Sequence, residues 1–155
     1  MNTLCRAALM AVLAAPTAGF SAVPGAAANG HCQPVGGSVF TNFVDPPTNA
    51  LGPVSGDLAG AVSVQILAIS GNVYHIRKHF VTTSGDTMTV ADTDFTTYPT
   101  SVSGLAAATE PMTITGGTGR FDGATGSVTF FGALNGDGEV TLRYSGTICF
   151  KPAKQ

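Results

Sequence analysis

Charged side chains are scarce in this 155-residue sequence, where Asp, Glu, Lys and Arg together make up 10% of the chain. The formal net charge is −2, and the seven basic residues are dispersed, with Arg77 and Lys78 the only adjacent pair. Because nucleic-acid binding needs a stripe or patch of basic side chains, the sequence argues against a nucleic-acid partner. The length is that of one modest domain, so we expect a single fold.

Strong helix formers and long apolar runs are also few. The chain instead carries 20 glycines and a body rich in threonine, a composition that disfavours helices and favours strands. Neutral polar residues supply solvation in place of charge, so the chain does not have the composition of a disordered protein. Its clearest apolar run, residues 7–15, is far shorter than the roughly 20 residues that cross a bilayer, and we expect no membrane span.

The first 28 residues have the pattern of a secretory signal peptide. Arg6 is the only charge, the apolar run follows it, and small residues at Ala26 and Ala28 predict cleavage before Asn29. A membrane anchor or a buried helix is the alternative, and the short apolar run disfavours both. The sequence therefore predicts a single mature domain over residues 29–155 in a secreted or periplasmic protein.

Removal of the signal peptide would leave Cys32 and Cys149, one near each end of the mature chain. In an oxidising compartment such a pair predicts a disulfide, although two buried free thiols are the alternative. The bond would close a loop of more than a hundred residues, which the chain-entropy model values at about 4–5 kcal/mol of stability.

Segments of β-type composition alternate with turn signals through the mature chain. Pro46-Pro47 predicts a loop that reaches about Pro53, and residues 96–108 predict a loop with a short helical turn. The expected strands cover residues 38–44, 54–69, 73–82, 87–95, 112–115, 127–133 and 139–150, the second of them either one strand or two joined at Gly60. Seven or eight antiparallel strands of this spacing fit an all-β closed barrel or a sandwich, and a bond between the chain ends fits a barrel whose ends meet.

The most specific stretch is the glycine-rich segment over residues 114–126. It lacks the Gly-Lys-Ser/Thr of a phosphate-binding loop, and Asp122 stands where a dinucleotide fingerprint needs its third small residue. The segment instead predicts a sharp bend between strands with Phe121 packed inward. Its motif residues are Gly116, Gly117, Gly119, Phe121, Gly123 and Gly126.

This motif resembles the signature of the allene oxide cyclase-like and dirigent-like β-barrel proteins, and the resemblance runs from about residue 54 to residue 150. It implies an eight-stranded antiparallel β-barrel with an apolar cavity, often assembled as a homotrimer, in which enzymes of the group fold a reactive substrate into one product. The cyclases share a glutamate near the first strand, where this chain has none between residues 38 and 54, so no catalytic residue is assigned. Within the group, the chain most resembles exported bacterial proteins that share the motif and have no assigned activity.

The segment over residues 74–80 is the one polar concentration. In a strand, His75, Arg77 and His79 share one face, while Tyr74, Ile76, Lys78 and Phe80 share the other. The polar face is either a ligand-binding or acid–base site, or simply the solvent face of a barrel strand.

Metal and hydrolase sites are disfavoured. Asp86, Asp92 and Asp94 do not have EF-hand spacing, and the two histidines lie roughly 13 Å apart in a strand, too far to chelate one ion. No Gly-x-Ser-x-Gly motif is present, and we expect no metal and no cofactor. The leading hypothesis is a secreted barrel that binds a small apolar ligand or has a structural role; a cyclase or isomerase and a surface adhesin are the alternatives.

Overall fold

The computed structural model describes residues 31–152, and the predicted signal peptide, with its cleavage site before Asn29, lies outside the described residues. The elements in chain order are β1 (Cys32–Asp45), β2 (Asn49–Gly56), β3 (Gly60–Ser70), β4 (Val73–Thr82), β5 (Thr87–Val90), β6 (Thr93–Pro99), β7 (Leu105–Gly117), the 3₁₀ turn η1 (Gly119–Phe121), β8 (Thr125–Asn135) and β9 (Val140–Cys149).

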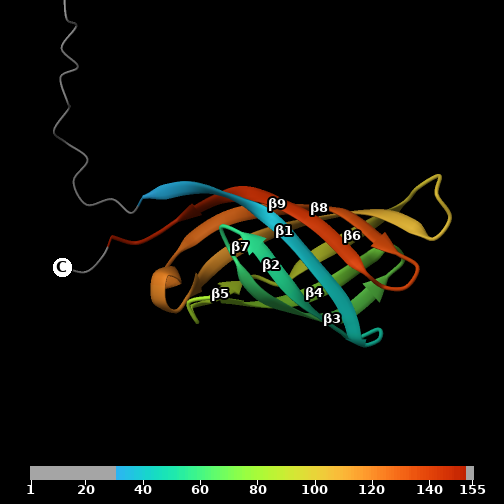
Figure 1. Ribbon diagram of the computed structural model, residues 1–155, viewed down its shortest axis with the longest axis horizontal. Coiled ribbons are helices and arrows are strands. Elements are labelled where there is room, and N and C mark those ends of the chain that lie inside the picture. The colour runs from blue at the N-terminus through green and yellow to red at the C-terminus, as the bar shows by residue number, and fades with distance from the viewer. Residues whose placement is uncertain (1–30, 153–155) are drawn as a thin grey trace, which may run out of the picture.

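All the strands belong to one antiparallel sheet that closes on itself (Figure 1). Strands β5 and β6 both lie between β4 and β7, so the nine strands occupy eight positions around the barrel. The sheet closes where β1 pairs with β9, from Cys32 opposite Cys149 to Thr41 opposite Val140. Because every strand has two neighbours, the closed sheet leaves no long edge open to pairing with another chain. The predicted fold class is confirmed.

The predicted disulfide between Cys32 and Cys149 is also confirmed, and it joins residues 117 positions apart. The two cysteines are direct partners in the register of β1 and β9, so the bond fastens the seam at which the barrel closes. From the sequence, the bond was predicted because an exported chain meets an oxidising compartment. In the structure, the pairing of β1 with β9 places the two cysteines next to each other.

Several strand boundaries differ from the sequence prediction. The predicted loop after Pro46-Pro47 is only a turn over residues 46–48, because β2 starts at Asn49 and contains Pro53. Of the two alternatives predicted for residues 54–69, the structure has two strands: the segment covers the end of β2 and, from Gly60 on, most of β3, which pairs antiparallel with β2. Over residues 96–108 the predicted loop is confined to residues 100–104 and the predicted helical turn is wrong, since the rest of the segment ends β6 and begins the 13-residue β7. Alanine side chains at 106–108 fit a strand here because β8 pairs with them along their full length.

The glycine-rich motif closes one end of the barrel. Gly119 has φ of 57°, a left-handed conformation, and it opens the single turn η1 that turns the chain back toward β8. At Gly117 a Cβ atom would lie 2.0 Å from the carbonyl oxygen of Thr87, so only glycine permits this approach of β7 to β5. Phe121, the last residue of η1, has no exposed surface, and its ring centroid lies 5.9 Å from that of Phe150, the residue after the disulfide-bonded Cys149.

Tyr144 fixes the interior near this end. Its hydroxyl donates to the carbonyl oxygen of Ser55 and accepts from the backbone N–H of Leu58, both at 2.9 Å. Burial of the ring raises the pKa of Tyr144 above its ordinary value. Gly37 makes room for the phenol, because a Cβ atom there would lie 2.5 Å from its oxygen. These contacts hold β9 and β2 together beneath β1.

Helices contribute nothing that could cross a membrane: within residues 31–152 there is no helix of the necessary length and apolar character.

Candidate functional site

A cavity of about 50 Å³ lies in the barrel interior toward the end opposite Phe121. The turns over residues 46–48, 71–72 and 136–139 surround this end, which lies to the right in Figure 1, away from η1. The cavity walls are mainly aliphatic and aromatic: Val39, Thr41, Phe43, Ala50, Val64, Ile66, Tyr74, Ile76, Lys78, Phe95, Glu110, Leu134, Val140 and Leu142. Every strand except β5 contributes at least one of these residues, so the closed barrel itself assembles the site.

Lys78 of β4 and Glu110 of β7 form an ion pair in this apolar wall. The Lys78 Nζ atom lies 2.5 Å from Glu110 Oε2, and the two side chains are 3% and 0% exposed. The ammonium also lies 4.4 Å from the centre of the Phe130 ring, within the range of a cation–π interaction. The second carboxylate oxygen, Oε1, has no hydrogen-bond partner among the described residues. A buried charged oxygen without a partner is costly, so it marks Glu110 as the chemically unusual residue of the cavity.

The pair lies at the break between β5 and β6, which together fill the one strand position between β4 and β7. On β4, pairing with β6 ends at Ile76 and pairing with β5 starts at His79, which leaves Arg77 and Lys78 opposite the interruption. On β7, pairing with β6 ends at Thr109 and pairing with β5 starts at Ile114, so residues 110–113 face the same interruption. With no intact strand between them there, β4 and β7 are joined on the inside by the Lys78–Glu110 pair.

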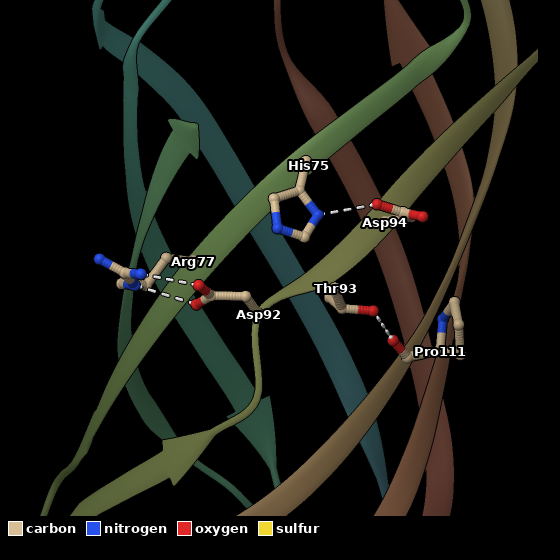
Figure 2. Close-up of polar contacts among 6 residues, drawn as sticks. All are labelled: His75, Arg77, Asp92, Thr93, Asp94 and Pro111. Carbon is tan, nitrogen blue, oxygen red and sulfur yellow. Dashed lines mark hydrogen bonds and ion pairs between the residues drawn. The ribbon is translucent and has the colours of Figure 1, made fainter. Parts of the chain in front are cut away.

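Pro111 explains why the strand breaks at this point. In an antiparallel ladder the N–H and C=O of one residue point to the same neighbour, and the Pro111 carbonyl accepts a hydrogen bond from the Thr93 hydroxyl of β6 (Figure 2). The nitrogen of Pro111 therefore also faces the interrupted side, where it has no hydrogen to donate. Proline is tolerated within β7 because no regular partner strand lies opposite it.

The predicted polar face of β4 lies on the outside of the barrel. His75, Arg77 and His79 are exposed and alternate with the buried Ile76, Lys78 and Phe80, as the strand pattern predicted. This places the three residues away from the cavity, which the other face of β4 lines. Their role in ligand binding stays a prediction.

Carboxylates of the interrupted strand lie against this outer face (Figure 2). Arg77 donates two hydrogen bonds to Asp92, at 2.9 and 2.7 Å, and these lower the pKa of Asp92 and raise the pKa of Arg77. His75 Nδ1 lies 2.9 Å from Asp94 Oδ1. The outer contacts thus join β4 to Asp92 and Asp94 on the solvent side. On the inside, Lys78 and Glu110 join β4 to β7.

Asp86, one of the three aspartates for which a metal site was disfavoured, takes a structural position. Asp86 accepts a hydrogen bond from Ser84 in the turn after β4, and its carboxylate lies against Gly119, where a Cβ atom would meet it at 1.8 Å. No group of three or more His, Cys, Asp or Glu side chains able to hold a metal ion occurs within the described part of the chain.

Sequence reasoning did not select Lys78 and Glu110. A signal for Lys78 was present, because the strand pattern placed it on the apolar face with Ile76 and Phe80. Glu110 was not selected because the predicted strand covers only residues 112–115, whereas β7 runs through Pro111 and Glu110 alternates inward with Ala108 and Met112. Two lone charges of opposite sign, each in the apolar register of its strand, are the pattern that would have indicated the pair.

The site can hold an apolar group against its walls and one polar group at the ion pair. Hydrogen bonds formed in such a low-dielectric interior are strong, and polar groups that fail to form them are penalised, so a few polar atoms can fix the orientation of a bound molecule. The cavity and the fold together define a class: closed eight-stranded antiparallel barrels with an apolar interior and a buried ion pair.

Comparisons with known proteins give no family assignment. No family model and no curated protein sequence matches the chain. Among solved structures, the chain is similar to the pterocarpan synthase dirigent protein, at 13% identity and a TM-score of 0.37, over 82% of this chain and 89% of the other. Membership of a dirigent-like or cyclase-like family stays a prediction from the glycine motif.

Proposed function

We propose that this protein is an exported barrel that binds a small, largely apolar ligand in the cavity at its open end. The observation that supports the proposal is an apolar cavity whose wall contains the buried Lys78–Glu110 pair. Small-molecule sites commonly combine apolar walls with one or two polar groups that set orientation. A barrel filled completely by its own side chains would instead favour a purely structural role.

The size of the cavity limits the ligand. A cavity of 150 Å³ lined by aliphatic side chains accepts benzene, so a cavity volume of about 50 Å³ accepts only the end of a narrow molecule. The rest of the ligand would lie in the mouth, against residues such as Phe43, Tyr74 and Leu134. Each methylene buried there contributes about 0.8 kcal/mol, which favours a short alkyl chain over a compact polar metabolite.

A titration with 1-hexanol tests the proposal. The readout is the NMR signals of the methyl groups of Leu142 and Val140, which line the cavity. We expect saturable shifts in the wild type and their loss in Ala50→Leu, because the new side chain occupies the cavity. Ala107→Leu is the matched control, since Ala107 is exposed on β7 and outside the cavity lining. Both variants must retain the strand circular-dichroism spectrum. Absence of saturation in the wild type, or unchanged binding in Ala50→Leu, would exclude ligand binding in this cavity.

A cyclase or isomerase is the second candidate function, and the unpartnered carboxylate oxygen of Glu110 favours it. A carboxylate in an apolar site can accept a proton from a bound substrate, and shape alone can then select one product. The test compares small molecules recovered with the wild-type protein and with Glu110→Gln after incubation with the same culture extract. Conversion by the wild type but not by the variant would establish turnover, and identical recovery would favour binding alone.

Export is part of the proposal. The disulfide at the barrel seam fits an oxidising compartment, and the predicted signal peptide supplies the route. Mass spectrometry of the protein from the culture medium or periplasm should find an N-terminus at Asn29. Because the disulfide lacks the two thiol hydrogens, the mass of the chain should rise by about two hydrogen masses on reduction. A retained N-terminus at Met1 would contradict export by cleavage. The homotrimer that the glycine motif implies is tested by sedimentation of the same sample.

A further inference from the structure

The ion pair in the cavity wall is chemically incomplete. Glu110 is fully buried, its Oε2 accepts from Lys78, and its Oε1 accepts from no group in the described residues. An ionised carboxylate has no proton to donate, so only a donor can satisfy Oε1. Glu110 belongs to the cavity lining, and its Oε1 has almost no accessible surface, so a small shift of the side chain would bring Oε1 to a donor on a molecule in the cavity.

The charge of the site restricts which donor fits. Lys78 and Glu110 carry opposite charges, and together they are neutral. A carboxylate ligand would add a second negative charge beside Oε1 in an apolar cavity, and a buried charge without its own partner is strongly disfavoured. An ether or a hydrocarbon brings no added charge but leaves Oε1 without a donor.

We infer that the cavity selects molecules with a neutral hydroxyl group on an apolar body, which donates a hydrogen bond to Glu110 Oε1. The inference rests on the proposed binding function and names the ligand class for the same site. The hydroxyl lies at the ion pair and the apolar body runs toward the mouth along Val140 and Leu142. Lys78 holds the carboxylate in place through Oε2, which leaves Oε1 as the acceptor.

Three short probes separate these chemistries. 1-Hexanol and methyl pentyl ether are isomers, so they match in size and differ in the presence of a donor, while hexanoate adds the negative charge. A hydrogen bond to a buried charged group corresponds to a difference of roughly tenfold or more in affinity. We expect 1-hexanol to bind the wild-type protein at least about tenfold more tightly than the ether and hexanoate.

Glu110→Gln changes the character of the acceptor without changing the shape of the side chain. The amide oxygen can accept from Lys78, and the amide N–H₂ then takes the place of Oε1 and donates. We therefore expect the preference for 1-hexanol over the ether to vanish or reverse. Asp122→Asn is the matched control, because it removes one carboxylate charge at an exposed position beside η1, at the end opposite the cavity, and its preference should equal that of the wild type.

A second variant protects the test against misfolding of the single substitution. The double variant Lys78→Met/Glu110→Met replaces the whole pair by apolar side chains, a change that buried ion pairs often tolerate. It should bind 1-hexanol and the ether with equal affinity. Equal binding of the two isomers by the wild type would overturn the inference and leave the proposed function standing. Failure of all three probes to bind would overturn both.

Discussion

Replacing one member of the Lys78–Glu110 pair is expected to destabilise the barrel severely. The side chains are 3% and 0% exposed, so water cannot solvate the charge that remains after Lys78→Met or Glu110→Met. Breaking a buried pair in this way costs about 3–5 kcal/mol, against a total stability of about 5–15 kcal/mol for a typical domain. Each single variant should therefore lose a large share of its free energy of unfolding.

The double variant Lys78→Met/Glu110→Met should recover most of that loss. Apolar replacement of a whole buried pair is neutral or stabilising by about 1–4 kcal/mol, because two desolvated charges disappear together. The coupling energy of the double-mutant cycle should then reach several kcal/mol. Urea unfolding followed by far-ultraviolet circular dichroism and tyrosine fluorescence measures all four proteins, since the sequence contains no tryptophan.

Arg77→Met provides the matched control on the adjacent residue of β4. Its partner Asp92 lies on the solvent side, where water and salt replace a lost ion pair, so the change in stability should be small. If Lys78→Met and Arg77→Met destabilised the protein equally little, the Lys78 ammonium would have to be hydrated, and the assignment of a buried ion pair would be refuted.

Three further predictions concern the rest of the barrel. The variant Cys32→Ser/Cys149→Ser should lose up to about 5 kcal/mol by chemical denaturation, since the bond closes a loop of 117 residues; a loss below about 1 kcal/mol would contradict a constraining role. Phe121→Ala should cost about 3–5 kcal/mol in the same assay because the ring is fully buried at the closed end, and a loss typical of a surface residue would mean that it does not fill the barrel. Because Arg77 lowers the pKa of Asp92, the pair stabilises the fold above the unfolded-state pKa of about 4, and this contribution is lost as the pH falls through the lower folded-state value. Thermal unfolding between pH 5 and pH 2 should thus show a steeper loss in the wild type than in Asp92→Asn, and parallel curves would argue against the pair.

The sequence predicted much of the architecture because its strongest signals are local. Alternation over residues 73–82 separated His75 and Arg77 from Ile76 and Phe80, and the structure keeps that separation. Glycine at 119 indicated a bend because few other residues adopt a left-handed conformation at low cost. The middle of the chain was harder, since the alanines before Glu110 fit a helix or a strand until a partner strand pairs with them.

The candidate site depended on tertiary structure for a different reason. Alternation states which side chains share a face, but it does not state whether that face points into the barrel or toward solvent. It also carries no information about which strands meet, and Lys78 and Glu110 are 32 residues apart. Only closure of the barrel, with one strand interrupted opposite Pro111, brings the two charges into contact. The sequence alone therefore determined a glycine-bent, disulfide-closed barrel, and the tertiary structure decided where its buried charges lie, because burial is a property of the assembled sheet.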